Sequence, residues 1–179
     1  MIELFFAICI VAMCHFIYES ILAPSFRLRL RFKLFALRDE LRDLKIERNG
    51  SLDNKHFDFL QDSINSLIFV LFRVDMSLVI SAQNSYQNDK EFRRNADERA
   101  KILDDCQIAV ASEIRRKSLW ILLLAIIVNS GMLVILTLPV ILLVHGLSET
   151  KKRLRKFASL SEQDMRRIAP QDSLTASLT

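Results

Sequence analysis

The sequence contains few of the residues that make tight turns. Only three of its 179 residues are Gly and only three are Pro, and these two residues most often separate one element from the next. Runs of β-branched residues are short, and Phe supplies 12 of the aromatic residues. A fold with many turns is thereby excluded, and the composition predicts long helices.

Groupings of residues that perform chemistry are also missing. The three His residues are scattered without the spacing of a metal site, and no Gly-rich phosphate loop is present. No Ser or Cys has a general base nearby in the sequence, and His56 and Asp58 stand where a helix start needs solvated caps. We therefore expect neither an enzyme nor a cofactor or metal site.

Cysteine is scarce and odd in number, with Cys9 and Cys14 in an apolar segment and Cys106 in a charged one. Small hydrophobic residues that happen to contain sulfur are typical of such positions. Cys14 and His15 do not form a haem attachment motif, because no second Cys stands three residues before Cys14. Sequence-specific nucleic-acid binding is not expected either. The net charge of +4 comes from clusters beside apolar segments, which favour an anionic lipid surface.

Apolar and charged residues, 51% and 26% of the chain, are segregated along it. Leu4–Phe26 contains a single charge, Glu19, and the residues between Lys117 and Glu149 include no Asp, Glu, Lys or Arg. A membrane-spanning helix needs about 20 apolar residues, so both stretches are long enough. We predict an all-α membrane protein with two transmembrane helices flanking a cytoplasmic helical hairpin of long, coiled-coil-like helices.

The first apolar stretch has two other interpretations. A cleaved signal peptide needs positive charge before the apolar run, whereas this chain starts Met1-Ile2-Glu3 and shows no small-x-small cleavage site. A buried helix of a soluble protein has a similar length. The membrane interpretation is favoured by a basic cluster placed where the helix would meet lipid headgroups. Its members are Arg27, Arg29, Arg31 and Lys33.

His15 and Glu19 are four residues apart and share a helix face. An ionisable pair inside a membrane indicates a functional site, but both residues could also lie near the interface and reach water. Pro24 disfavours helical geometry before it and is expected to interrupt the helix. A second helix is predicted from about Phe26 to Glu47 by Leu residues spaced three and four apart. It could lie in the membrane surface or be an ordinary bundle helix.

The middle of the chain predicts a hairpin of two charged helices. After a turn at Asn49-Gly50-Ser51, a heptad stripe indicates helix pairing. The stripe consists of Phe57, Leu60, Ile64, Leu67, Leu71, Val74 and Leu78. A turn is expected at 84–88, and no breaker separates the next helix, Asp89–Lys117, from Leu119.

Three successive antiparallel rods would direct Leu119 away from the bilayer, so one element must depart from this alternation. A bend at Pro24 or a break within the 51–88 helix would resolve the conflict.

The second apolar stretch is polar at its centre, at Asn129-Ser130-Gly131. An Asn in the bilayer seeks a partner on another helix, so Asn129 is a candidate contact in a homo-oligomer, or it bonds within its own helix. A second basic cluster follows. Its cations are Lys151, Lys152, Arg153, Arg155 and Lys156.

Positive charge flanks this stretch on both sides, although positive residues favour the cytoplasm and a straight span has only one end there. We favour a cytoplasmic hairpin with both termini outside. The alternative is a re-entrant loop broken at Asn129-Ser130-Gly131 or Pro139, with both of its ends inside.

The layout divides the chain into five parts. These are a first transmembrane helix (1–25), a basic amphipathic helix at the membrane surface (26–48), a helical hairpin (51–117), a second transmembrane segment (118–147), and a basic helix with a disordered tail (148–179). Together with LFALRDELRDL after Pro24, this layout resembles the two-transmembrane effectors of bacterial anti-phage defence systems, including those of retrons.

The resemblance implies a toxin-like protein held by an inhibitory protein or ribonucleoprotein. Once released, it would oligomerise and permeabilise the bacterial inner membrane, causing abortive infection. Two other functions stay open. A membrane-anchored scaffold would bind a cytoplasmic partner through the hairpin and would tolerate Asn129→Leu, which should inactivate an effector. A small channel subunit would use His15 and Glu19.

Overall fold

The computed structural model describes residues 2–47, 53–105, 108–130 and 147–169, without the side chains of residues 47 and 147–151. Every regular element in these ranges is helical, which confirms the all-α part of the predicted class. The elements are α1 (Ile2–Ile17), a π-helical turn η1 (Tyr18–Leu22), α2 (Ala23–Glu47), α3 (Asn54–Val70), α4 (Met76–Asn88), α5 (Lys90–Asp104), α6 (Ala109–Asn129), α8 (Leu147–Ala158) and α9 (Glu162–Ile168).

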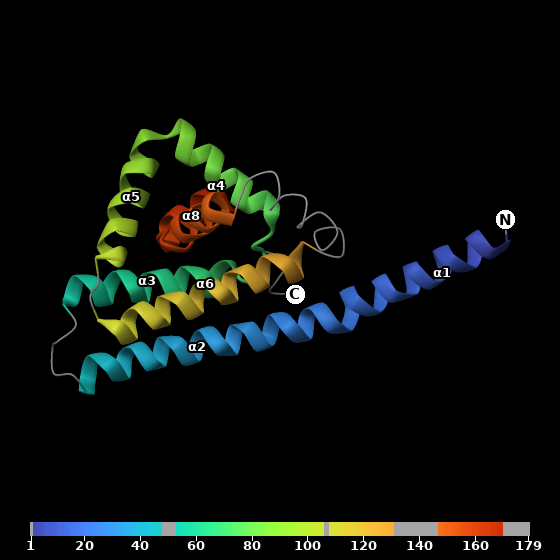
Figure 1. The fold of residues 1–179 in the computed structure, drawn as a ribbon, viewed down its shortest axis with the longest axis horizontal. Helices are drawn as coiled ribbons and strands as arrows, with labels where there is room; N and C mark the ends of the chain where they lie inside the picture. The colour runs from blue at the N-terminus through green and yellow to red at the C-terminus, as the bar shows by residue number, and fades with distance from the viewer. Residues whose placement is uncertain (1, 48–52, 106–107, 131–146, 170–179) are drawn as a thin grey trace.

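The helix α1 continues into α2 as one rod (Figure 1), so the interruption expected at Pro24 is wrong. Pro24 lacks an N–H, and within an α-helix its ring clashes with the carbonyl four residues earlier. The π-turn η1 lies directly before it, and the Ala23 N–H bonds to the Tyr18 carbonyl, five residues back. Such a wider turn is a known cause of helix irregularity. Here it accommodates Pro24 without ending the helix.

Three helices, α2, α3 and α6, lie side by side at the centre of the body, with α2 packed against both others (Figure 1). The rod α2 runs antiparallel to α6, since Arg27 contacts Asn129 at one end and Glu40 contacts Lys117 at the other. The chain therefore leaves the base of α1 along α2 and returns to it along α3 and again along α6.

The apolar stripes predicted from the sequence form the core between these helices. Five Leu residues of α2 are buried: Leu30, Leu34, Leu37, Leu41 and Leu44. Six members of the heptad stripe are also buried: Leu60, Ile64, Leu67, Leu71, Val74 and Leu78. The seventh, Phe57, is half-buried, with the Lys45 ammonium 5.6 Å from its ring centroid.

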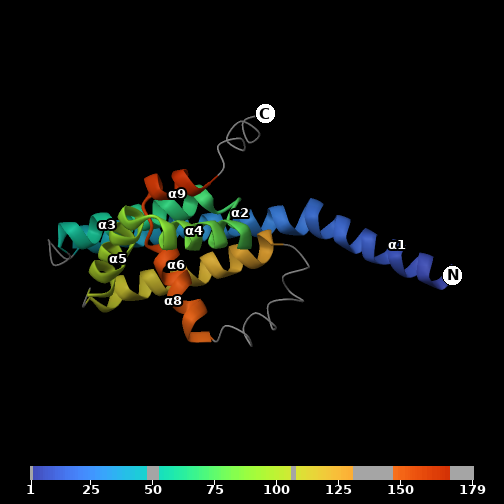
Figure 2. The same ribbon diagram turned by 90° about the horizontal axis from the view of Figure 1, so that it is seen from above.

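The helices α4 and α5 form an arch over the three-helix layer, and α8 lies inside the triangle that they enclose (Figure 1). The helix α8 packs on α3, α4, α5 and α6, and α9 packs on α3 and α4. Seen from above, α1 alone stands clear of this body (Figure 2). The body thus includes chain from both sides of the second apolar stretch.

The prediction of a two-helix hairpin over 51–117 is wrong, because the helices of this region are interrupted at two further places. The first break lies between Val70 and Met76, where the Asp75 carboxylate caps α4 by accepting from the Leu78 N–H at 2.9 Å. A break at this position is one of the two solutions to the alternation of rods. The turn expected at 84–88 does not form, because α4 continues through these residues and only Asp89 separates it from α5. The Asp89 side chain caps α5 by accepting from the N–H groups of Glu91 and Phe92.

The second break separates α5 from α6, so the helix expected from Asp89 through Lys117 is not continuous. Two carboxylates, Asp104 and Asp105, stand at the end of α5, where the helix dipole disfavours negative charge. Asp104 instead pairs with Arg115 of α6 at 2.6 Å. As predicted, α6 runs without interruption from the charged region into the apolar stretch.

One helix in the described part of the chain is long and apolar enough to cross a membrane, the α1–α2 rod over Ile2–Ile46. No side chain of α1 is buried. The second predicted span, 118–147, has residues 131–146 outside the described ranges. Its first part belongs to α6 and is packed in the body, where Ser118, Ile121, Leu122, Ala125 and Ile126 are buried.

Candidate functional site

The end of α6 meets the base of α1 at a polar junction formed by Tyr18, Arg27, Asn129 and Ser130 with the α3–α4 break. The Asn129 amide donates to the carbonyls of Leu71 and Val74, at 2.7 and 2.8 Å. Its carbonyl oxygen accepts from Arg27 Nε at 2.7 Å. One side chain thereby connects α2, the α3–α4 break and α6.

The junction exists because helix ends leave backbone groups without partners. The Leu71 and Val74 carbonyls belong to the break after α3, among residues that are themselves buried. A primary amide can donate two hydrogen bonds and accept others, and Asn129 does both. Each neutral bond contributes about 0.5–1.5 kcal/mol, and one to a charged group about 1.5–3 kcal/mol.

Two further bonds complete the junction. The Ser130 hydroxyl accepts from the Met76 N–H at 3.2 Å, at the first residue of α4. The Tyr18 hydroxyl donates to the Val128 carbonyl at 3.1 Å, in the last turn of α6. The junction therefore caps α4 at its start and α6 at its end. It also fastens both to the π-turn from which α1 emerges.

The bond within its own helix, one of the two expectations for Asn129, is therefore wrong, and the contact in a homo-oligomer stays a prediction. The amide bonds to other helices of the same chain, because the α3–α4 break supplies carbonyls that no sequence pattern had placed there. Gly131, the third residue expected at this centre, lies outside the described residues.

The basic cluster of α2 divides between the interior and the surface. Arg27 bonds to Asn129, and Arg31 lies between the rings of Phe35 and Phe72, 5.5 and 5.4 Å from their centroids. Arg29 and Lys33 are exposed. The expectation that all four face lipid headgroups is wrong for Arg27 and Arg31. Because an α-helix has 3.6 residues per turn, residues that alternate along the sequence point to different sides of the helix.

The C-terminal basic cluster is divided in the same way. Lys152 and Arg153 are exposed, whereas Arg155 lies 3.5 Å from Asp104 and Lys156 lies 2.8 Å from Asp97. These last two therefore have partners within the chain, and a membrane-surface role for the cluster stays a prediction. The Lys151 side chain lies outside the description.

Lys156 forms a small polar cluster with Tyr86 and Asp97. Its ammonium donates to the Tyr86 hydroxyl at 2.5 Å, and that hydroxyl donates to Asp97 at 2.7 Å. Burial by itself raises the pKa of Asp97, but the bonds from Lys156 and Tyr86 outweigh it, so this pKa lies below its ordinary value. Burial lowers the pKa of Lys156, and its bonds to Asp97 and Tyr86 outweigh that effect and raise it.

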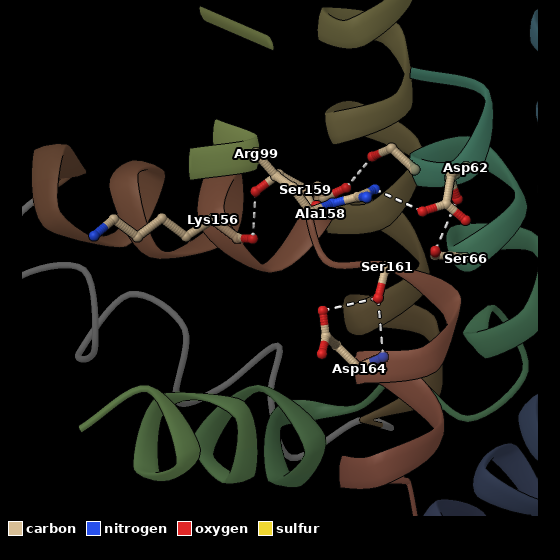
Figure 3. Close-up of polar contacts among 9 residues, drawn as sticks. Asp62, Ser66, Arg99, Lys156, Ala158, Ser159, Ser161 and Asp164 are labelled. Carbon is tan, nitrogen blue, oxygen red and sulfur yellow. Dashed lines mark hydrogen bonds and ion pairs between the residues drawn. The ribbon is translucent and has the colours of Figure 1, made fainter. Parts of the chain in front are cut away.

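Arg99 holds the turn between α8 and α9 against α3, a role that sequence reasoning missed. Its guanidinium bonds to Asp62 of α3 at 2.7 Å and to the Ser159 carbonyl at 2.7 Å (Figure 3). In the same region, the Ser63 hydroxyl donates to the Ala158 carbonyl. No local pattern distinguishes Arg99 from the other charges of α5, since its partners lie 37 and 60 residues away.

His15 and Glu19 lie exposed on α1 and η1. Within the described ranges, no group of three His, Cys, Asp or Glu side chains is arranged to hold a metal ion. No protein-family model, curated protein or solved structure matches this chain.

Proposed function

We propose that this chain is a membrane-anchored effector of bacterial anti-phage defence, of the kind its layout resembles, and that the fold described here is its resting state. The helix α1 enters the inner membrane, and the helical body lies on the cytoplasmic face. An inhibitory protein or ribonucleoprotein holds the resting state. Its release lets copies associate in the membrane and perturb the bilayer.

The observation that carries this proposal is the polar junction. It joins the one described helix that is apolar enough for a membrane to the end of the α6 segment that begins the second apolar stretch. An apolar segment packed on a water-exposed body, and held at its end by four side chains, is suited to being released. A passive anchor needs no such attachment.

The packing of α8 supports a single crossing of the membrane. Ser130 and α8 belong to the same body, since α8 packs on α6. The 16 residues between Ser130 and Leu147 could extend at most about 55 Å, less than two crossings of a hydrocarbon core of about 30 Å. On this proposal both ends of the second stretch lie on one side, as in the re-entrant alternative. The topology with both termini outside does not fit this packing.

The charges support a cytoplasmic body. The exposed cations of α2, α6 and α8 belong to the body at the C-terminal end of α1. On the α1 side, Glu3 is the only charged side chain before Glu19. Positive residues near a membrane helix favour the cytoplasmic side. The N-terminus would then lie outside, and the C-terminus inside.

Expression of the chain alone in bacteria tests the effector proposal, with membrane potential followed by a voltage-sensitive dye. We expect depolarisation and arrested growth. Asn129→Leu should depolarise the membrane at lower expression than the unaltered chain, because it frees the end of α6; this reverses the sign expected from the sequence alone. Asn84→Leu, at an exposed position of α4, is the matched control. Healthy growth with an intact potential at good expression would refute the proposal.

A second candidate, a membrane-anchored scaffold, is favoured by one observation. Asn129 and Ser130 are satisfied within the chain, so the polar centre of the second stretch requires no partner in the bilayer. On this hypothesis α1 only tethers the body. Replacing residues 2–17 by an unrelated apolar helix should then preserve function, whereas the effector proposal predicts lost toxicity.

A further inference from the structure

An apolar surface with basic residues at its border lies on α2 and α6, on the side away from the core. Its apolar members are Leu28, Phe32, Ala36, Trp120 and Leu124, here called the α2–α6 face. Phe32 and Trp120 are 62% and 60% exposed. Two shallow hollows, one along α2 and one between α2 and α6, share Lys33 and Ala36 in their linings, so the face is continuous.

The exposed charges that border this face without an ion-pair partner are all basic. Arg29, Lys33 and Arg116 are exposed, and none has an ion-pair partner within the described ranges. Lys117, which follows Arg116 at the end of the face far from α1, pairs with Glu40 and Glu113. A surface that covers this face must therefore supply both apolar groups and negative charge.

The face is continuous with α1 along one rod. Exposed apolar side chains extend from Ile2 to Phe32, about 45 Å at 1.5 Å per residue. This length exceeds a hydrocarbon core of about 30 Å, and such a mismatch is relieved by tilting. A tilted rod brings one side of α2 down to the headgroups. Trp is enriched in that layer, and Lys and Arg reach it from buried stems.

Self-association through this face is disfavoured. In a two-fold dimer the same patch meets itself. Arg29, Lys33 and Arg116 of one copy would then meet a face that is itself basic and whose neighbouring carboxylates, Glu40 and Glu113, already pair with Lys117. An anionic leaflet supplies apolar chains and negative phosphates together. We infer that the α2–α6 face docks on the anionic lipid leaflet around α1, so that α2 and α6 lie against the membrane. This inference rests on the membrane insertion of α1 in the proposed function, but not on toxicity.

Trp120 is the only Trp in the sequence, so its fluorescence reports directly on this face. The full chain is reconstituted in vesicles of phosphatidylcholine alone and in vesicles mixed with phosphatidylglycerol, with brominated lipids as quenchers. We expect a blue shift and strong quenching of Trp120 in the anionic vesicles. Both should weaken at high salt, which screens exposed charges.

Charge reversal at Arg29→Glu, Lys33→Glu and Arg116→Glu should abolish this quenching. Each basic residue at an anionic surface contributes roughly fivefold to association, so the three together contribute on the order of a hundredfold. The helix α1 should still insert, which resistance to alkaline extraction reports. The salt dependence of the unaltered chain tests the inference independently if this variant fails to fold.

The matched control is Lys90→Glu, Arg94→Glu and Lys101→Glu, the same charge change on exposed residues of α5, across the α3–α6 layer from α2 (Figure 1). Its Trp120 quenching should equal that of the unaltered chain. Equal quenching in neutral and anionic vesicles, or a water-exposed Trp120 in both, would overturn the inference. So would shielding of Trp120 that depends on protein concentration in detergent, since a second copy would then cover the face.

Dye leakage from the same vesicles separates this inference from the effector proposal. Quenching without leakage supports the docked face and counts against a membrane-perturbing function. Leakage without quenching supports a membrane-perturbing function and counts against the docked face.

Discussion

The two apolar stretches of this chain look alike in sequence and differ in the structure. No side chain of α1 is buried, whereas the part of the second stretch within α6 contributes Ile121, Leu122, Ala125 and Ile126 to the core. Both are uncharged over many residues, so hydropathy alone does not separate them. Polar groups separate them: Ser118 is buried in α6, and Asn129 and Ser130 end it with bonds to neighbouring helices.

This difference shows that an apolar run is not by itself a span. A helix in lipid needs partners only for its side chains, since its backbone bonds are internal. The end of α6 instead exchanges bonds with backbone groups of other helices. Those bonds place it in a folded body and leave α1 as the described element suited to lipid.

The largest effect should separate two Leu positions, one from each stretch. Leu122 is 2% exposed and Leu4 is 65% exposed. Leu122→Ala should lower the free energy of unfolding by about 2–5 kcal/mol, because it removes packed atoms and leaves a cavity. Leu4→Ala should leave it nearly unchanged in detergent. Chemical denaturation followed by circular dichroism measures both, and equal losses would show that α1 belongs to the core.

Loss of the polar junction should have an effect of similar size. Asn129→Leu leaves the Leu71 and Val74 carbonyls without their donor, at a cost of roughly 1–3 kcal/mol for each buried group. Hydrogen exchange should speed up at the end of α3 and the start of α4. The control Asn84→Leu should change neither, and unaltered protection in Asn129→Leu would contradict the junction.

Removal of Arg99 should loosen α8, the helix that follows the second stretch. Arg99→Ala breaks two charge-assisted bonds, to Asp62 and to the Ser159 carbonyl. The bond to the buried Ser159 contributes about 1.5–3 kcal/mol, and solvent at Asp62, which is 37% exposed, limits the other to no more than about 1 kcal/mol. Limited proteolysis should then cut near α8 while α2 and α3 stay intact. Arg94→Ala, at an exposed position of the same helix, should behave like the unaltered chain.

The smallest effect concerns pH and Asp97. Its pKa is lowered in the fold, so its contribution to stability is present above the unfolded pKa of about 3.9 and is lost as pH falls through the lower folded value. The Asp97 side chain is 47% exposed, and solvent limits the contribution to no more than about 1 kcal/mol. Asp97→Asn should flatten the acid limb of the stability curve. A curve identical to that of the unaltered chain would exclude this pair.

Sequence periodicity predicts the helical class and the packed stripes, because each depends on spacing within one helix. The spacing of Leu30, Leu34 and Leu37 predicts that this face of the helix is buried, whichever neighbouring helix covers it. The break after Val70 was predicted only as one of two solutions to the alternation of rods, and the break after Asp104 was not predicted, since neither contains Gly or Pro. Asp75 could have signalled the first, as an acidic residue suited to cap a helix start.

The junction was only half predictable. Asn129 was conspicuous as a polar residue in an apolar run, but its partners come from a break 55 and 58 residues away. The same holds for Pro24. Proline ends most helices, but Pro24 follows a π-turn that a one-dimensional pattern does not reveal. Long-range hydrogen bonds are set by tertiary packing and leave no period in the sequence.

Side-specific thiol labelling tests the central claim, that both ends of the second apolar stretch lie on one side of the membrane. Single cysteines are introduced as Arg94→Cys in α5 and Gln163→Cys in α9, both exposed, after Cys9, Cys14 and Cys106 are replaced by Ala. A membrane-impermeant maleimide is added to spheroplasts and to inverted inner-membrane vesicles. The account predicts that both positions label only in the inverted vesicles. Labelling of Gln163→Cys from the outside, with Arg94→Cys labelled from the inside, would show that the second stretch spans the bilayer and would contradict it.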